Sequence, residues 1–238
     1  MLTSSSWREG PVVSLTFDTD NCPDLAVEFL QERLEAKGMA GTFFCTRRYD
    51  SLRPPHEAAL HPFLRDFQHL DKTLEPLSDL SRAIPEAMGN RCHQLTCNGL
   101  LYAGLAGAGL LYDSAWPMCL QPGIAPVLLH TGIFELPVFW LDSLYWQRED
   151  DALDPKQVRL PGLKVFLFHP VHLWHNATAQ TYRHIMALPY AERYRPELVA
   201  PGRGILHFFD RLLDLLQAED IPCATCADIA LAAKGQAA

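Results

Sequence analysis

The clearest features of the hydrophobic pattern are three apolar runs with the composition of buried β-strands. They are Val12–Phe17, Gly41–Cys45 and Leu163–Phe168, and they are rich in β-branched and aromatic residues. Between the first two runs, apolar side chains recur at helical spacing, at Leu25, Phe29, Leu30 and Leu34. Asp24 is placed to cap this helix and Gly38 to end it. A strand, a helix and a second strand in this order are typical of a parallel sheet.

The rest of the chain alternates short apolar runs with helical segments. We expect further strands at Ala58–Leu60, Asn90–Leu95, Leu110–Tyr112 and Ile133–Trp140, and a last strand or turn at Cys223–Ala227. We expect helices within Asp71–Glu86, where Pro76 should mark a helix start rather than an interior position, at Asn98–Gly109 and at Gly204–Ala218. Arg148–Gly162 should be a loop and Ala177–Pro201 amphipathic or irregular. About seven strands alternating with helices predict a single α/β barrel-like domain over residues 1–238.

Composition and charge describe an ordinary globular chain and argue against some partners. The 238 residues are 48% hydrophobic and 20% charged, and the net charge is −8. A net negative charge disfavours a general surface for nucleic acid or for an anionic membrane. The N-terminal residues lack the apolar core of a signal peptide, and no apolar run reaches the roughly 20 residues of a membrane-spanning helix. We therefore expect a cytoplasmic protein.

The cysteines favour free thiols over disulfides. Seven cysteines are scattered through a chain without a secretion signal, and reduced thiols are the usual state in such a chain. Cys223 and Cys226 form a single CxxC pair, whereas a structural zinc site would need a second pair. Cys92 and Cys97 flank His93, and we expect them to be packed thiols as well.

Acids, histidines and an arginine occur where the apolar runs stop. They are Asp18, Asp20, His61, Arg91, His93 and His169. In a parallel α/β barrel the C-terminal strand ends form one rim, where functional groups collect. Strand side chains alternate between faces, so Asp18 and Asp20 should share one face of their strand, and Arg91 and His93 should likewise face the same pocket. A carboxylate pair at the end of a buried strand is costly without a cation. One acid could therefore bind a metal while the other handles a proton.

The motifs around these residues resemble the polysaccharide deacetylase superfamily, the NodB-homology domain of carbohydrate esterase family 4. The matching segments are Thr16-Phe17-Asp18-Thr19-Asp20, Gly41–Phe44, His56–Pro62, Asn90–His93 and Val165–Pro170. They span most of the chain in the family's order and spacing, and they best match a subgroup associated with bacterial surface-polysaccharide gene clusters. The resemblance implies a distorted (β/α)7 barrel.

The resemblance also implies metal-dependent hydrolysis of an N-acetyl amide on a sugar. Asp18 takes the position of the general base, with Arg91 as its partner. His169 takes the position of the acid that protonates the departing amine, and either Glu135 or Asp142 could orient it.

The metal ligands implied by the resemblance are Asp20 and His61, and the third is open. The family places a second histidine four residues after the first, where this chain has Arg65, and a guanidinium cannot ligate a metal. His93 is the replacement that we favour, and His69 is its rival. An Asp-His-His set with an open position suits catalytic Zn²⁺ and also accepts Mn²⁺, Fe²⁺, Co²⁺ or Ni²⁺.

Substrate contacts are the least defined part of the site. His172 follows His169 by three residues and could line the pocket, whereas we expect His175 at the surface. Aromatic residues that could stack on a sugar, or belong to the core, are Trp140, Tyr145 and Trp146.

Three further polar residues have ordinary structural explanations. We expect His56 to be packed or bonded to the backbone. Arg47 and Arg48 could meet a phosphate or a nucleotide-linked sugar, but a solvated pair is the simpler expectation.

Three functions are consistent with the sequence. The leading hypothesis is a metal-dependent N-deacetylase acting on a sugar or sugar precursor of a bacterial surface polysaccharide. A cytoplasmic location would favour a small nucleotide- or lipid-linked amino sugar. The second keeps the barrel and metal but acts on another linear or cyclic amide. The third is a degenerate domain that binds carbohydrate without catalysis, which the departure at Arg65 would allow.

Overall fold

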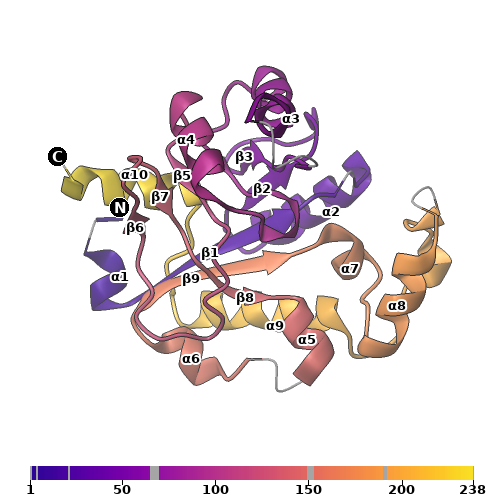
Figure 1. Ribbon diagram of the computed structural model, residues 1–238. Coiled ribbons are helices and arrows are strands. Elements are labelled where there is room, and N and C mark those ends of the chain that lie inside the picture. Colours follow the sequence, from indigo (N-terminus) through magenta and orange to yellow (C-terminus); the bar gives the residue numbers. More distant parts are fainter. Residues whose placement is uncertain are drawn as a thin grey trace.

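A curled, mostly parallel β-sheet organises the structure, a computed structural model that describes residues 2–3, 5–20, 22–64, 70–148, 153–189 and 192–237 (Figure 1). Within these residues the sheet has nine strands in the order β6-β7-β5-β4-β3-β2-β1-β9-β8. Their bounds are β1 (Pro11–Asp18), β2 (Thr42–Cys45), β3 (Glu57–Leu60), β4 (Gly89–Asn90), β5 (Tyr112–Asp113), β6 (Val127–Leu128), β7 (Phe134–Glu135), β8 (Val138–Leu141) and β9 (Gly162–Phe168). Only the pairing of β6 with β7 is antiparallel.

Helices surround this sheet. Their bounds are α1 (Ser6–Glu9), α2 (Asp24–Glu35), α3 (Leu70–Ala83), α4 (Gly99–Gly107), α5 (Ser143–Arg148), α6 (Pro155–Arg159), α7 (Pro170–Trp174), α8 (Ala179–Ala187), α9 (Ile205–Ala218) and α10 (Cys226–Ala237), with 3-10 turns η1 (His93–Leu95) and η4 (Pro196–Leu198). Figure 1 shows α3 and α4 together on one side of the sheet and α9 on the other. None of the helices in the described part of the chain is long and apolar enough to cross a bilayer.

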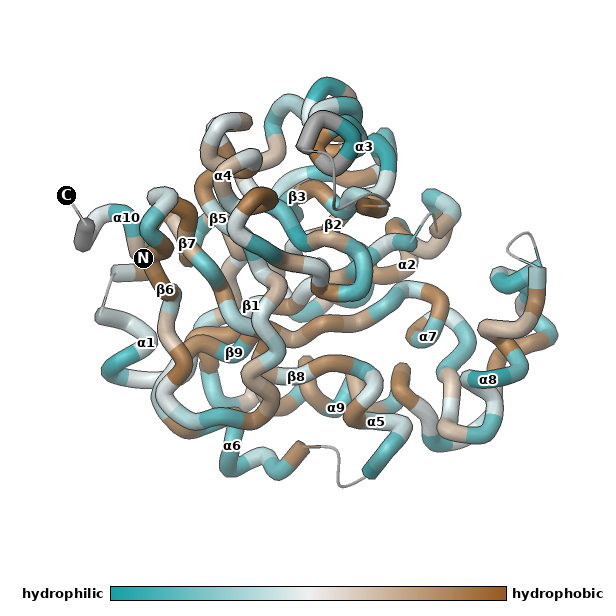
Figure 2. Tube along the Cα trace, viewed as in Figure 1, coloured by the Kyte–Doolittle hydropathy of each residue, from teal (hydrophilic) through white to brown (hydrophobic). Residues whose placement is uncertain are grey.

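The centre of the fold is the long parallel pair β1 and β9. Their registers align from Pro11 with Gly162 to Phe17 with Phe168, and every residue of β9 is buried. Figure 2 shows hydrophobic residues along much of this region. The ring of Phe209 from α9 packs edge-on against both phenylalanines, with centroids 5.9 and 5.0 Å away. Parallel strands covered on both faces give unbroken apolar runs, which explains why the sequence pattern identified this pair.

The curl of the sheet is partly closed by a segment that follows β5. The amide of Val138 in β8 donates to the carbonyl of Trp116 at 2.8 Å, and the amides of Met118 and Leu120 donate back to Val138 and Phe139 at 2.9 and 2.8 Å. Residues 116–120 therefore run beside the edge strand β8. The barrel-like α/β architecture predicted from the sequence is confirmed as a curled, incompletely closed sheet.

Two helix boundaries differ from those expected. Pro23, not Asp24, precedes the first turn of α2, and the carboxylate of Asp24 instead pairs with Arg47 at 2.8 Å. Leu25 is 58% exposed and lies outside the buried face of the helix. Pro76 lies inside α3 rather than at its start. A proline at this position leaves one intrahelical hydrogen bond unmade, and its neighbour Leu77 is buried.

Two expected strands are shorter than predicted. The strand expected at Asn90–Leu95 ends at Asn90, because the chain turns at η1, where Gln94 and Leu95 have φ of 59° and 53°. The run Ile133–Trp140 forms two strands, β7 and β8. Pro137 lies between them and has no amide hydrogen for the ladder.

Several helices were not expected from the sequence. Helix α6 lies in the segment predicted to be a loop and begins after Asp154, whose carboxylate accepts from the amide of Lys156 at 2.9 Å. Helix α8 lies in the segment Ala177–Pro201, capped by Thr178. The strand or turn expected at Cys223–Ala227 is reduced to a single bridge of Cys223 with Val13, because α10 already begins at Cys226. The caps of α6 and α8 are ordinary sequence signals for a helix start.

The glycine at position 89 allows the Tyr112 side chain of β5 to lie across β4 and reach β3. Gly89 in β4 is paired with Tyr112 in β5, and a Cβ on Gly89 would lie 2.0 Å from the tyrosine ring. The ring passes over Gly89, and its hydroxyl donates to Glu57 in β3 at 2.7 Å. Glu57 also accepts from the hydroxyl of Thr42 at 2.8 Å and from the amide of Ala227, in the first turn of α10, at 3.0 Å. The carboxylate thus joins three strands to the C-terminal helix.

We predict that Gly89→Ala lowers the free energy of unfolding by about 1–3 kcal/mol, because the methyl group displaces the Tyr112 ring. Urea denaturation would measure the change. The matched control is Gly107→Ala in α4, where an added Cβ meets nothing within 4 Å, so that stability should be unchanged or slightly higher. Equal stability of the two variants would contradict this account of the packing.

Candidate metal and acid–base site

A buried arginine fixes the carboxylate at the end of β1. The Arg91 guanidinium is fully buried and donates to Asp18 Oδ1 at 2.9 Å and to Thr16 Oγ1 at 2.7 Å. Its Nε and its other amino nitrogen donate to the carbonyl and hydroxyl of Ser114 at 2.7 and 2.8 Å, and the Phe44 ring lies 4.0 Å below it. The pairing of Arg91 with Asp18 predicted from the sequence is present.

Asp20 lies close to two histidines. Its Oδ1 is 3.3 Å from Nε2 of His61 and 2.9 Å from Nδ1 of His93. One ligand atom from each of the three residues lies within 4.8 Å of the other two. The structure therefore brings together the metal ligands that we favoured. His69, the rival ligand, and Arg65 lie outside the described residues.

Strand alternation, which we expected to align Asp18 with Asp20 and Arg91 with His93, explains neither pair. β1 ends at Asp18, and Asp20 lies beyond it with a φ of 40°, so strand alternation does not place the two acids. His93 is on the turn η1 rather than on a strand with Arg91. Backbone turns after the strand ends bring these side chains to the same cavity.

The donor set fits a divalent cation. Nδ1 of His61 is 2.6 Å from the carbonyl oxygen of Arg91. A carbonyl only accepts, so Nδ1 carries the hydrogen and Nε2 presents a lone pair. Nε2 is buried without a hydrogen-bond partner among the described residues and faces the Asp20 carboxylate. Two imidazole nitrogens and a carboxylate oxygen, one histidine oriented by a carbonyl, are characteristic of a metal centre.

The charge state of Asp20 also suits the binding of a divalent cation. Burial alone would raise the pKa of Asp20, but the neighbouring His61, His93 and His169 outweigh it, and the pKa lies well below its usual value. The carboxylate is therefore anionic, the form that ligates a cation.

A second cluster lies beside the first and is centred on Asp142, the residue after β8. Its Oδ2 accepts from the amide of His169 at 3.0 Å, from Nδ1 of His169 at 2.9 Å and from Nδ1 of His172 at 2.5 Å. Nε2 of His169 is 3.5 Å from Oδ2 of Asp20. Burial would lower the pKa of His169, but Asp142, then Asp20 and Asp18, outweigh it and raise the pKa to about 10.

Asp142 rather than Glu135 is thus the acid that orients His169. Glu135 is buried elsewhere and accepts from the amides of Ala115 and Trp116, both at 2.8 Å. Asp142 carries the same sequence signal as the other site residues, an acid directly after an apolar run.

A cavity of about 340 Å³ joins the two clusters. Its walls include Asp18, Asp20, His93, Asp142, His169 and His172, and the aromatic residues Trp146, Tyr182 and Tyr194. The rings of Trp146 and Tyr182 are stacked, with centroids 4.9 Å apart. No sequence signal distinguished Tyr182, because α8 was not expected.

Two predictions about side chains near this cavity are wrong. Trp140 is completely buried and stacks on Phe208 with centroids 4.8 Å apart, so it belongs to the core and has no face free for a sugar. His175 was expected at the surface but is buried, bonded through Nε2 to the carbonyl of Arg193. The structural role expected for His56 is confirmed, since its Nδ1 accepts from the amide of Gly41 at 3.2 Å.

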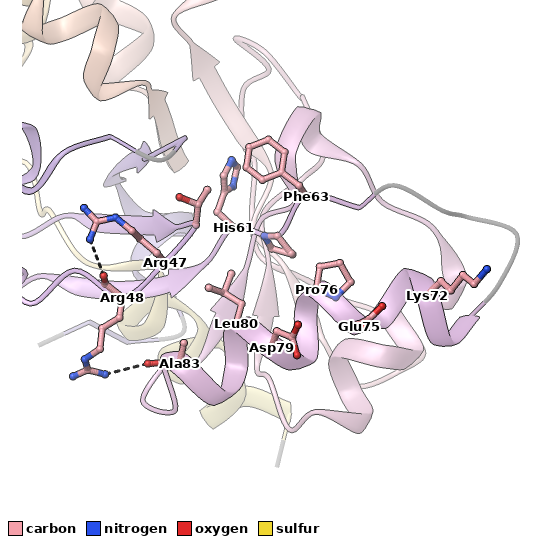
Figure 3. A pocket seen from close by; sticks show the side chains of 12 residues that line it. Arg47, Arg48, His61, Phe63, Lys72, Glu75, Pro76, Asp79, Leu80 and Ala83 are labelled. Carbon is pink, nitrogen blue, oxygen red and sulfur yellow. Dashed lines mark hydrogen bonds between the residues drawn. The ribbon is translucent and has the colours of Figure 1, made fainter. Parts of the chain in front are cut away.

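A larger cavity of about 730 Å³ lies on the other side of His61, between α3 and the segment after β2 (Figure 3). Arg47 pairs with Asp24 at 2.8 Å and Arg48 with Glu86 at 3.0 Å. All four side chains are partly exposed. Because carboxylates already pair with both arginines, a solvated role fits them better than a phosphate site.

Comparison with known proteins places this geometry in context. A family model described as "WbmS-like: Polysaccharide deacetylase" matches residues 15–186. A comparison with curated proteins gives no match.

Solved structures with the same fold include a Bordetella bronchiseptica protein named as a polysaccharide deacetylase involved in O-antigen biosynthesis. Its TM-score is 0.72 at 19% identity, over 85% of this chain and 89% of that chain. A Mycobacterium smegmatis protein named as a polysaccharide deacetylase has a TM-score of 0.64 at 19% identity, over 99% and 95%. A Bacillus anthracis protein named as a CE4 family pseudoenzyme has a TM-score of 0.53 at 13% identity, over 92% and 65%.

We predict that Zn²⁺ stabilises the metal-free protein against unfolding and that His93→Ala removes most of this effect. At about 100 times its Kd, a ligand of the folded state adds about 2.7 kcal/mol to the free energy of unfolding. Thermal unfolding at several Zn²⁺ concentrations would measure it. The control is His184→Ala, an exposed histidine of α8 outside both clusters, which should respond as the unmodified protein does. Full stabilisation of the His93 variant would exclude His93 as a ligand and favour His69.

Proposed function

Because the chain belongs to the WbmS-like polysaccharide deacetylase family, we propose that it is a metal-dependent hydrolase that removes an N-acetyl group from a sugar. Family membership implies a carbohydrate substrate. One observation carries the proposal. A fixed carboxylate, two of the three candidate cation ligands and a histidine with a raised pKa line one cavity of about 340 Å³.

The residues that would hold the metal are Asp20, His61 and His93. Zn²⁺ is the ion that we favour, and Mn²⁺, Fe²⁺, Co²⁺ or Ni²⁺ would suit the same donors. A bound divalent ion would polarise an amide carbonyl and lower the pKa of a bound water. The anionic state of Asp20 and the buried lone pair of His61 support this assignment.

Asp18 and His169 would carry out the proton transfers. Asp18 would take a proton from the attacking water, and Arg91 holds it in place from the buried side. His169 would give a proton to the departing amine. Asp142 bonds Nδ1 of His169 and leaves Nε2 facing the cavity. One proton is taken up and one is released, so the pair ends the reaction with its total proton count unchanged.

The cavity suggests how a sugar would be held. The stacked Trp146 and Tyr182 rings offer an aromatic wall of the kind that packs against a sugar face. A volume of about 340 Å³ is at the lower end of the range for small-ligand sites. With the cytoplasmic location predicted from the sequence, this favours a small nucleotide- or lipid-linked amino sugar. The O-antigen assignment of the Bordetella protein supports a surface-polysaccharide pathway.

The alternative is a domain that binds carbohydrate without catalysis, and the pseudoenzyme among proteins of this fold gives it a precedent. A binding domain, however, has no use for a base and a protonated acid beside the same cation ligands. Hydrolysis of another linear or cyclic amide would use the same metal ligands, base and acid. An assay with different substrates is needed to distinguish it from deacetylation of a sugar.

We predict that the protein with Zn²⁺ or Co²⁺ releases acetate from N-acetylated amino sugars, free or nucleotide-linked, and that Asp18→Asn lowers kcat/KM by about 10²–10⁴-fold. The variant keeps an acceptor for Arg91 but loses the base. It should still bind Zn²⁺ like the unmodified protein, which titration would check. Full activity of Asp18→Asn would refute the base. Metal and sugar binding without acetate release from any substrate would favour the binding domain.

We predict that Asp142→Asn moves the alkaline limb of the kcat/KM profile to lower pH by about 1–3 units. The carboxylate raises the pKa of His169, and without it burial lowers that pKa. His169 must be protonated to act as an acid, so activity is lost at a lower pH. Asp50→Asn, whose side chain is 96% exposed, is the control and should leave the limb in place. An unmoved limb in Asp142→Asn would show that His169 is not the acid.

A further inference from the structure

The proposed reaction leaves one buried polar residue of the site without a task. Nδ1 of His172 donates to Oδ2 of Asp142 at 2.5 Å, closer than the 2.9 Å of His169 to the same oxygen. Burial would raise the pKa of Asp142, but the two histidines outweigh it and the pKa lies well below its usual value. The carboxylate can only accept, so both Nδ1 atoms carry hydrogens.

These three residues do not form a second metal centre. They have the composition of one, with ligand atoms within 4.8 Å of each other. Oδ2 of Asp142 already accepts three hydrogens, from the two Nδ1 atoms and from the amide of His169 at 3.0 Å. A carboxylate oxygen has about two lone-pair sites, so none is left on this oxygen for a cation. The cluster therefore holds protons between its members.

The start of α7 brings the two imidazoles to one oxygen. His169 precedes the helix, Pro170 is its first residue, and the amide of His172 donates to the carbonyl of His169 at 3.0 Å. Residues three apart on a helical turn lie on one face. Both rings consequently lie over Asp142, with centroids 5.0 Å apart.

The surroundings of His172 suit an aromatic hydrocarbon better than an imidazole. Trp146 and Tyr182 pack edge-on around it, with centroids 5.3 and 5.2 Å away, and the side chain is 6% exposed. Nε2 is buried without a hydrogen-bond partner among the described residues. An unpaired buried nitrogen is costly, so packing does not explain a histidine here. The bond from Nδ1 to Asp142 does.

We propose that His172 is a positioning residue, whose Nδ1 hydrogen fixes Oδ2 of Asp142 where that oxygen holds His169. The inference rests on the proposed function, in which His169 is the acid. Without His172 the carboxylate loses one of its three donors and is free to turn about its Cβ–Cγ bond. His169 would then be held less firmly, and its Nε2 would lie less often beside the departing amine.

Three substitutions of His172 separate this role from a substrate contact through Nε2. Asparagine places its amide nitrogen near Nδ1, glutamine places it near Nε2, and phenylalanine keeps only the ring. His172→Phe and His172→Gln should lower kcat at least about tenfold with little change in KM, because the acid is misaligned. His172→Asn should keep most of the activity. Retention by glutamine, together with a raised KM for asparagine, would overturn the proposal in favour of substrate binding. An unchanged kcat in His172→Phe would also overturn the positioning role.

A second readout does not depend on turnover. In the Zn²⁺-loaded protein, the Nδ1 hydrogen of His169 should give an NMR resonance that exchanges slowly with water. Exchange should be faster in His172→Phe and His172→Gln, and near the original rate in His172→Asn. An unchanged resonance in the phenylalanine variant would refute the positioning role. Absence of activity in the unmodified protein would instead refute the proposed function, and the resonance would still report on His172.

Discussion

The site depends on the burial of the Arg91 guanidinium among the ends of three strands. A buried cation without partners is strongly unfavourable, and every nitrogen of this one has an acceptor on Thr16, Asp18 or Ser114. The same residue, through its carbonyl, fixes the tautomer of His61. One residue therefore aligns both the candidate base and a candidate metal ligand, and it connects β1, β4 and β5 at the rim.

Each of the three acids around the cavity has its own partner of positive or proton-donating character. Asp18 is held by Arg91, Asp20 by His93, and Asp142 by His169 and His172. This separation prevents the acids from sharing protons and keeps their tasks distinct. It also explains how three carboxylates can be grouped around a small cavity, since like charges so close would otherwise raise one another's pKa values.

The sequence predicted the parts of this site that stand at the ends of apolar runs. Asp18 is the last residue of β1, and His61 and His169 directly follow β3 and β9, where hydrophobicity alone defines the strand end. Asp20 and His93 lie side by side as expected, but the strand argument for this was wrong. Positive φ angles at Asp20 and Gln94 decide where the chain goes, and no residue pattern predicted them.

Exposure was the property that the sequence predicted least well. Both faces of this sheet are covered, so a strand aromatic such as Trp140 does not reveal whether it faces the core or the cavity. Trp146 and Tyr182, which line the cavity, come from short helices whose packing is decided by distant parts of the chain.

The junction of Glu57 with α10 has a consequence for the response of the fold to acidity. Burial raises the pKa of Glu57 to about 7, despite its hydrogen bonds to Ala227, Tyr112 and Thr42. Between about pH 4.5 and 7, Glu57 therefore keeps its proton in the folded chain and has released it in the unfolded chain, where the carboxyl pKa is near 4.5. By linkage, this group favours folding fully below pH 4.5, and its contribution is lost as the pH rises to 7. Attachment of the C-terminal helix is therefore coupled to proton uptake, through a carboxyl group that does not line the cavity.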